Sequence, residues 1–256
     1  MDRVREPLPT RVEATPALPP AYVHAIEAGL LDLELTLPAD IRATIDGHVR
    51  LLLAWTGAIN LTAIRDPVAV AERHVIDSLT GVAVLRDLGA ERFLDLGSGG
   101  GLPGIPLAAA IPAAARLVES IGKKADFLEV ATTAIGLAGR VRVARDRAES
   151  LAHDRRERGA WPVVTARAVG ALGELVELAL PLLIDGGSLI AWKRGELTAE
   201  LRAAQGALTA LGGGSIRVVE PAVRSLPGHR LVVVTRTGRV PDAFPRDPAV
   251  RRRRPW

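Results

Sequence analysis

The sequence contains no cysteine, and this absence removes several kinds of chemistry at once. Disulfide bonds, zinc sites with thiolate ligands and thiol nucleophiles are all excluded. The histidines show no pair at metal-ligand spacing, so no metal site is expected. Charges interrupt every apolar stretch before it reaches the roughly 18 residues of a membrane helix. We therefore expect a soluble, cytoplasmic protein.

The first 20 residues lack the apolar core of a signal peptide. They hold five prolines together with Asp2, Glu6 and Glu13, so residues 1–20 are expected to form a flexible leader. The whole chain has 256 residues, of which 48% are hydrophobic. This length and composition predict one α/β domain with an added cap, or at most two small domains.

The net charge of +4 is concentrated at the C-terminal end. Residues 246–256 hold five arginines and one aspartate, whereas acidic and basic residues balance in the rest of the chain. Such a run is either a solvated tail or an arm that binds nucleic-acid phosphates, and the sequence leaves both interpretations open. The candidate phosphate contacts in it are Arg251, Arg252, Arg253 and Arg254.

Apolar residues at helical spacing dominate the first third of the chain. Two helical segments are predicted between residues 21 and 57. Asp66-Pro67 then provides the N-cap and first residue of a third helix, which runs to about residue 88. Residues 21–90 are therefore predicted to form a helical cap.

After residue 90, short β-rich runs alternate with helical segments. Strands are predicted at 92–96, 116–119, 141–144, 162–166 and 188–192, and helices near 105–111, 122–137, 170–183 and 196–211. This alternation predicts crossover connections and a parallel sheet. Two further strands, 216–223 and 230–237, are separated by a loop too short for a crossover and should pair antiparallel. We predict a Rossmann-like α/β domain over 91–240, with a mostly parallel seven-stranded sheet and an antiparallel last strand, followed by a basic tail at 241–256.

A glycine-rich segment, Asp95-Leu96-Gly97-Ser98-Gly99-Gly100-Gly101-Leu102-Pro103-Gly104, follows the first predicted strand. Its glycines let the backbone turn tightly and approach a ligand, and the helix that it opens offers free N–H groups. Two ligands fit this segment. Gly99-x-Gly101-x-x-Gly104, with Glu119 at the end of the second strand, matches a dinucleotide fingerprint. The same stretch matches the acid-x-Gly-x-Gly-x-Gly pattern of methyltransferases that use S-adenosylmethionine.

The context favours the methyltransferase over a NAD-dependent oxidoreductase. The predicted antiparallel pair at the end suits a class I methyltransferase, and the dinucleotide interpretation has no use for Asp95. The candidate cofactor residues of this region are Asp95, Gly97, Ser98, Gly99, Gly101 and Glu119.

Several short motifs resemble the RsmG (GidB) family of bacterial 16S ribosomal RNA guanine-N7 methyltransferases. They are Asn60-Leu61-Thr62, Arg73-His74-Val75-Ile76-Asp77-Ser78-Leu79, the glycine segment through Leu107, Glu119-Ser120-Ile121-Gly122-Lys123-Lys124, Arg147-Ala148-Glu149 and Ala166-Arg167-Ala168-Val169. The resemblance covers residues 21–256.

The resemblance implies methyl transfer from S-adenosylmethionine to N7 of one guanosine in 16S ribosomal RNA, with the small ribosomal subunit as partner. The cofactor contacts that it carries over are Gly97, Leu102, Ala148, Glu149 and Arg167. Three places depart from the family pattern: Lys193-Arg194-Gly195, where the family has Lys-Gly, His229-Arg230-Leu231, where it has Arg-His-Leu, and the more basic tail.

Guanine N7 has a lone pair and no proton, so its methylation needs no general base. The rate should come from holding N7 in line with the methyl–sulfur bond. Arg167 and Lys193, both at the ends of strands, are the candidates for orienting the base. The candidate RNA contacts are Lys123, Lys124, Arg230 and the four arginines of the tail. We expect a monomer, and an inactive RNA-binding module of the same fold is a further alternative.

Overall fold

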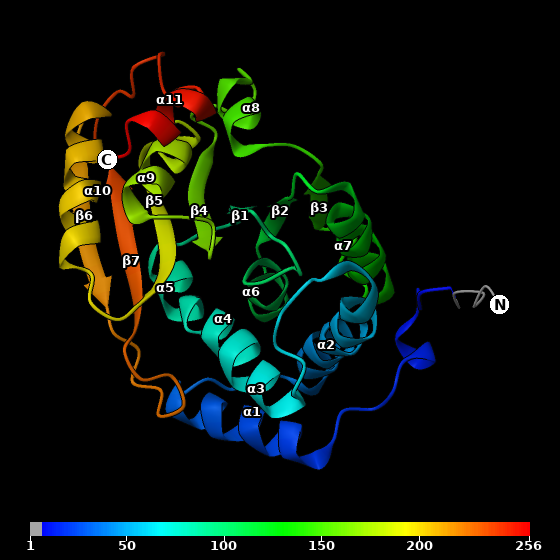
Figure 1. Ribbon diagram of the computed structural model, residues 1–256. Helices are drawn as coiled ribbons and strands as arrows, with labels where there is room; N and C mark the ends of the chain where they lie inside the picture. The colour runs from blue at the N-terminus through cyan, green and yellow to red at the C-terminus, as the bar shows by residue number, and fades with distance from the viewer. Residues whose placement is uncertain (1–6) are drawn as a thin grey trace.

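The computed structural model describes residues 7–256, and residues 1–6 of the predicted leader lie outside it. Helices cover both faces of a central seven-stranded sheet (Figure 1). Along the chain the strands are β1 (Arg92–Leu96), β2 (Ala114–Val118), β3 (Val141–Ala144), β4 (Trp161–Arg167), β5 (Leu183–Arg194), β6 (Gly214–Val219) and β7 (His229–Arg236). Across the sheet their order is β3-β2-β1-β4-β5-β7-β6.

The direction of each strand follows from its connection. The five strands β1 to β5 are parallel and are joined by helical crossovers, whereas β7 runs antiparallel to both β5 and β6. This confirms the predicted α/β fold with an antiparallel last strand. β6 ends at Val219, earlier than predicted, and Pro221 has no N–H to donate to a longer ladder.

Alternation of side chains along β1 divides the core in two. Phe93 belongs to the core on one face and Leu94 to the core on the other, and both are fully buried. The first face is covered by α1 (Pro20–Asp32), α2 (Ala39–Ile59), α5 (Gly81–Asp87), α6 (Gly104–Ala110) and α7 (Gly122–Ala134). The second is covered by α8 (Ala148–His153), α9 (Leu172–Ala179) and α10 (Thr198–Ala210). The cap helices α1 and α2 therefore share one core with the sheet.

The third helix of the cap is interrupted. It begins as predicted, with the Asp66 carboxylate accepting from the Ala69 N–H at 2.8 Å. It then consists of α3 (Pro67–Val70), a π-helical turn η2 (Ala71–Ile76), α4 (Asp77–Leu79) and α5. π turns are rare and are frequently found at functional sites, which makes Arg73 and His74, both in η2, candidates for the site. None of the helices within residues 7–256 is both long and apolar enough to span a membrane.

The described part of the leader packs along α2. The indole N–H of Trp55 donates to the Pro9 carbonyl at 2.8 Å, and Nε of Arg50 donates to the Pro16 carbonyl at 2.9 Å. A Cβ on Gly47 would come 3.1 Å from Val12, so this helix position is in close contact with the leader. The leader segment has no regular pattern of backbone hydrogen bonds. Its carbonyl groups instead accept hydrogen bonds from side chains of α2.

The basic tail is also folded. It contains α11 (Pro248–Arg253), whose N-cap Asp247 accepts from the Ala249 N–H at 2.7 Å. Figure 1 shows this segment, in red, beside α8 and α9. The tail therefore lies against the face of the sheet opposite to the cap.

Candidate functional site

The predicted site residues meet because they follow the carboxyl ends of parallel strands, which share one edge of the sheet. The glycine segment follows β1, Glu119 follows β2, Ala148 and Glu149 follow β3, and Arg167 ends β4. The antiparallel strand β7 brings its first residue to the same edge, since His229 pairs with Arg194 at the end of β5. One edge of the sheet thus collects side chains from six strands.

The glycine segment forms a tight loop that Glu119 holds in place. Gly97, Gly99 and Gly101 all have positive φ angles, of 65°, 54° and 84°. The N–H of Gly99 donates to one carboxylate oxygen of Glu119 at 2.9 Å, and the N–H of Ile121 donates to the other at 2.8 Å. A carboxylate has about four acceptor positions, so Glu119 retains capacity for ligand hydroxyls.

Asp95 lies fully buried beneath this loop. Its Oδ1 accepts from the Thr165 hydroxyl at 2.6 Å, whereas its Oδ2 has no hydrogen-bond partner within residues 7–256. Burial raises the pKa of Asp95 to about 6. The Thr165 hydroxyl and the backbone N–H of Gly104, at the start of α6, offset part of the cost of burying this carboxylate.

The cap helix α2 packs directly on the loop through His48. Nε2 of His48 donates to the Gly100 carbonyl at 2.8 Å, and because a carbonyl only accepts, the ring proton lies on Nε2. Burial lowers the pKa of His48 to about 4, so the ring is neutral. A Cβ on Gly100 would come 2.7 Å from Cδ1 of Leu52 on the same helix. The cap therefore fixes the position of the glycine loop.

A cavity of about 200 Å³ opens beside the loop. Its wall contains the predicted cofactor residues Gly97, Glu119, Ala148 and Glu149. A Cβ on Gly97 would come 2.8 Å from Val169, so only glycine fits at that point of the wall. The carboxylates and the bare loop backbone suit a nucleoside with hydroxyls and a cationic group.

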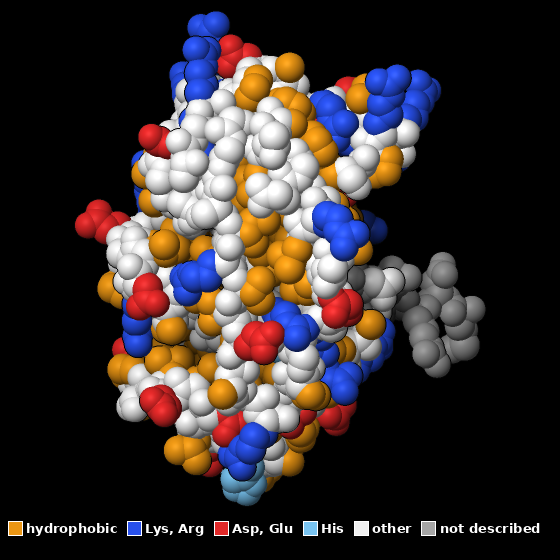
Figure 2. Space-filling model, turned by 90° about the vertical axis from the view of Figure 1, so that its left-hand side faces the viewer, with side chains coloured by type: hydrophobic (Ala, Val, Ile, Leu, Met, Phe, Trp, Pro, Cys, Tyr) orange, Lys and Arg blue, Asp and Glu red, His pale blue; other side chains and the backbone are white. Residues whose placement is uncertain are grey.

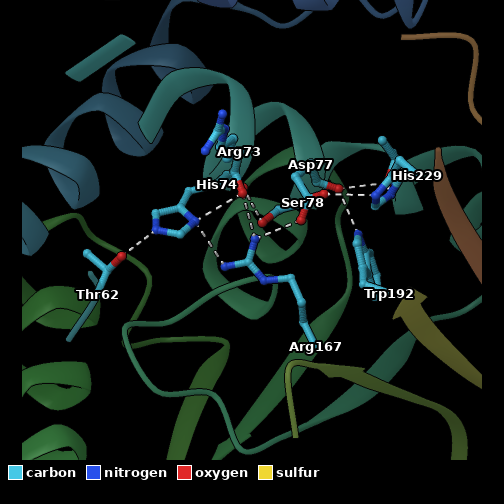
Figure 3. Close-up of polar contacts among 9 residues, drawn as sticks. Thr62, Arg73, His74, Asp77, Ser78, Arg167, Trp192 and His229 are labelled. Atoms are coloured by element: carbon cyan, nitrogen blue, oxygen red, sulfur yellow. Dashed lines mark hydrogen bonds and ion pairs between the residues drawn. The ribbon is translucent and has the colours of Figure 1, made fainter. Parts of the chain in front are cut away.

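A larger cleft of about 470 Å³ lies next to this cavity, and its centre is an ion-pair network (Figure 3). Nη1 of Arg167 donates to Oδ2 of Asp77 at 2.8 Å and to the Arg73 carbonyl at 3.2 Å. Nδ1 of His229 lies 3.0 Å from the other Asp77 oxygen, and the indole N–H of Trp192 donates to the Asp77 carbonyl at 2.7 Å. Burial acts to raise the pKa of Asp77, but His229 and Arg167 outweigh it and hold that pKa below its usual value.

His74 enters the cleft as a neutral ring. Its Nδ1 donates to the Arg73 carbonyl at 3.0 Å, and its Nε2 accepts from the Thr62 hydroxyl at 2.6 Å. Burial and the nearby Arg167 charge lower the pKa of His74 to about 4. His74 and Asp77 both face Arg167 (Figure 3).

The segment after β4 separates the two hollows. Ala168 lines the cleft, and Val169, the next residue, lines the cavity. Ala168 has a φ of 58°, an uncommon left-handed conformation for a residue with a side chain. A ligand bound in the cavity and a ligand bound in the cleft would therefore lie next to each other, with only the Ala168-Val169 segment between them.

Comparison with known proteins identifies the family. The model of the family described as rRNA small subunit methyltransferase G matches residues 41–224, well over half of the chain.

The chain belongs to this family.

A ribosomal RNA small subunit methyltransferase G of Chloroflexus aggregans is 42% identical over 80% of this chain and 85% of its own length. One of Sorangium cellulosum is 36% identical over 95% of this chain and 98% of its own length. Among solved structures, an O-methyltransferase from Bacillus cereus in complex with SAH has a TM-score of 0.58 at 17% identity, covering 83% of this chain and 97% of that one, which shows a shared fold. Membership of this methyltransferase family confirms the prediction of an enzyme of this class over the oxidoreductase.

Within this methyltransferase, the two candidate orienting residues have different surroundings. Arg167 lies at the centre of the cleft network. Lys193 lines the cleft, but its ammonium group is held by the Gly170 carbonyl at 2.8 Å and the Glu200 carboxylate at 2.5 Å. Glu200 also accepts from the N–H of Leu172, so Lys193 is tied to the start of α9.

The candidate RNA contacts are also distributed unequally. Lys123 is exposed and Lys124 half-buried in the first turn of α7, at the edge of the sheet that carries the site. Arg230 pairs with Glu220 at 2.7 Å. Arg252, Arg253 and Arg254 are exposed. Figure 2 shows Lys and Arg side chains protruding at the top of the molecule, the end where Figure 1 places α8 and α11.

Arg251 departs from its predicted role. Its side chain is buried and contacts the carboxylates of Glu149 and Glu174, so it is not available to an RNA phosphate. The reason is the helical periodicity of α11, which turns Arg251 inward and Arg252 and Arg253 toward solvent, while Arg254 follows the last residue of the helix.

Two contacts of the site were not predicted. His48 carries no sequence signal, because its target is a backbone carbonyl 52 residues away. His229 was noted only as a departure from the family pattern, although the antiparallel course of β7 was a usable signal that it reaches the site edge. Within residues 7–256, no group of three or more His, Asp or Glu side chains is arranged to hold a metal ion.

Proposed function

We propose that this protein transfers a methyl group from S-adenosylmethionine to N7 of a guanosine in 16S ribosomal RNA. The observation that carries the proposal is the pair of adjoining hollows in a chain of this family. The cavity beside the glycine loop suits the cofactor, and the cleft around Arg167 suits the acceptor base. The segment after β4 lies between them and would bring donor and acceptor together.

The residues of the cavity fit the cofactor. Glu119 would accept from the ribose hydroxyls, and Ala148 and Glu149 would flank the adenine. The Asp95 carboxylate, buried beneath the loop, would attract the cationic amino-acid portion, with Gly97, Ser98, Gly99, Gly101 and Leu102 shaping the loop around it. When bound, S-adenosylmethionine supplies the electrophilic methyl group.

The cleft fits an acceptor that needs orientation and no deprotonation. His74 is neutral and Arg167 is paired with Asp77, so neither side chain adds an uncompensated charge at the centre of the cleft, where positive charge develops on the base. The second guanidinium nitrogen of Arg167 remains available to donate to an acceptor such as guanine O6. Lys193 would assist from the rim of the cleft once it is released from Glu200.

The partner would be RNA in the small ribosomal subunit. Lys123 and Lys124 on one side of the site and Arg252, Arg253 and Arg254 on the other would bind its phosphates. An enzyme that acts on ribosomal RNA works where ribosomes are assembled, so the proposal places it in the cytoplasm.

The test is transfer of tritiated methyl groups from S-adenosylmethionine to 30S subunits, naked 16S RNA and 70S ribosomes. The labelled RNA should break at one guanosine after borohydride reduction and aniline treatment, because N7 methylation labilises the base. Label that resists this treatment would contradict N7 as the acceptor. Binding of S-adenosylmethionine without any transfer would indicate the inactive RNA-binding module, and tight binding of NAD alone would exclude the proposed cofactor.

A further inference from the structure

The helix α11 has an inner and an outer side with different contacts. On the inner side, the Arg251 guanidinium contacts a carboxylate oxygen of Glu149, from α8, and lies 3.7 Å from a carboxylate oxygen of Glu174, from α9. Only 8% of Arg251 is exposed. On the outer side, Arg252, Arg253 and Arg254 face solvent. One residue of the basic run is thus set apart from the other three.

Both partners of Arg251 belong to the wall of the cofactor cavity. Glu149 and Glu174 line it together with Glu119 and Asp146, while Arg147 is the one cation among its lining residues. The guanidinium of Arg251 compensates the negative charges of Glu149 and Glu174 from the side of the wall that faces away from the cavity. Without it, the Glu149 and Glu174 carboxylates would lose the cation that both of them contact, and their like charges would repel each other.

The rest of the tail holds Arg251 at this position. The carboxylate of Glu177 on α9 is fully buried and accepts from the Arg246 backbone N–H at 2.7 Å, from the Arg246 guanidinium at 2.7 Å and from the Trp256 indole at 2.7 Å. The Arg246 guanidinium lies 4.4 Å from the centre of the Trp256 ring. A Cβ on Gly173 would come 2.8 Å from Trp256, so α9 leaves room for that indole. The tail is therefore anchored at both ends of α11.

We propose that Arg251 is a positioning residue for the cofactor: from outside the cavity it fixes Glu149 and compensates Glu174, two residues of the cavity wall. The inference rests on the proposed function, because it places S-adenosylmethionine in this cavity. It divides the tail into an inner arginine that serves cofactor binding and three outer arginines that are free for RNA.

The primary experiment measures the Kd of S-adenosylmethionine by calorimetry, and kcat and KM for methyl transfer, in Arg251→Gln, Arg251→Lys and a control. Arg202→Gln is the control, since it removes the same charge from an exposed position on α10. Arg251→Gln should raise the Kd and the KM for S-adenosylmethionine at least about tenfold, while kcat at saturating cofactor stays within about twofold. Arg251→Lys should recover part of the loss, because it restores charge without the planar fork.

Two further variants separate positioning from folding. Adding Glu174→Gln to Arg251→Gln removes the repulsion and should recover part of the cofactor affinity. Glu177→Gln, which weakens the anchor of the tail outside the cavity, should raise the same Kd although Arg251 itself is intact. An Arg251→Gln variant with lowered melting temperature and unchanged Kd would overturn the proposal. A wild-type protein that does not bind S-adenosylmethionine would instead overturn the proposed function.

Discussion

Arg167 combines a full charge with a fixed direction, because Asp77 and the Arg73 carbonyl both accept from it. The Asp77 side chain is 7% exposed, so removal of Arg167 leaves a buried carboxylate that has lost its guanidinium partner and keeps its contact with His229. We expect Arg167→Ala to lower methyl transfer at least ~10-fold, the cost of one charged hydrogen bond near the reacting centre. Arg167→Lys should not restore it, since an ammonium group lacks the fork that meets both acceptors.

The measurement is a single-turnover assay with saturating S-adenosylmethionine, with Arg155→Ala as the control because Arg155 is exposed in the turn before β4. Wild-type turnover in Arg167→Ala would remove Arg167 from the site.

Asp95 predicts a pH dependence of cofactor binding. Burial raises its pKa to about 6 from 3.8, so the folded protein binds more protons than the unfolded chain between these values, and this group makes stability fall as pH rises through that window. A cation bound near the Asp95 carboxylate favours its charged form, so binding of S-adenosylmethionine should release a proton near pH 6. The Kd should be about tenfold weaker at pH 5 than at pH 7.5.

Calorimetry in buffers of different ionisation enthalpy measures both the Kd and the proton release. Asp95→Asn should bind more weakly and lose the pH dependence. A wild-type Kd that is constant between pH 5 and 7.5 would rule out Asp95 as the partner of the cation.

At the scale of elements, two glycines differ in the space around them: Gly101 lies in the glycine loop against α2, and Gly57 lies near the end of α2 itself. Gly101 has a φ of 84°, and a Cβ there would come 2.5 Å from Ile105 and 3.0 Å from Nε2 of His48. Gly57, near the end of α2, would meet nothing within 4 Å. Gly101→Ala should therefore lower the melting temperature and cofactor affinity together. Gly57→Ala should raise stability by up to about 1 kcal/mol, or about 2–4 °C in Tm, because alanine favours a helix.

Thermal unfolding with and without S-adenosylmethionine tests both variants. A Gly101→Ala protein that keeps the wild-type shift in Tm on adding cofactor would show that α2 does not control the loop.

The elements themselves were largely predictable, because their signals are local. β1 and β3 have the predicted bounds, and the glycine segment lies between β1 and α6 as its pattern indicated. The interruption of the third cap helix at η2 was not predictable, since its apolar spacing continues through the π turn. The contacts of the site were less accessible still: Arg167 and Asp77 are 90 residues apart, and only the order of strands in the sheet brings them together.

At the scale of the whole molecule, both ends of the described chain depart from the expectation drawn from composition. In the leader, proline carbonyl groups accept hydrogen bonds from the side chains of Trp55 and Arg50. The basic tail is anchored by one buried carboxylate, that of Glu177. Composition reports the polarity of a segment. It does not report whether a partner for that segment exists elsewhere in the fold, and here α2 and α9 provide those partners.

Exposed cations lie both at the start of α7 and in the tail, where RNA phosphates could bind them. For binding to single-stranded nucleic acid, log Kd rises by about 0.7 per tenfold rise in salt for each phosphate contact. If Arg252, Arg253 and Arg254 bind phosphates, changing all three to Gln should reduce the salt slope for 16S RNA by about 2, and Lys123→Gln with Lys124→Gln should reduce it by about 1.4.

The matched control is Arg155→Gln with Arg156→Gln, which removes two exposed charges from the turn before β4, at the opposite edge of the sheet. Filter binding over a range of salt concentrations measures these slopes. Equal slopes in the tail variant and the wild type would show that the outer arginines do not contact RNA, whereas a slope lowered as much by the control pair would show that the effect is one of net charge alone.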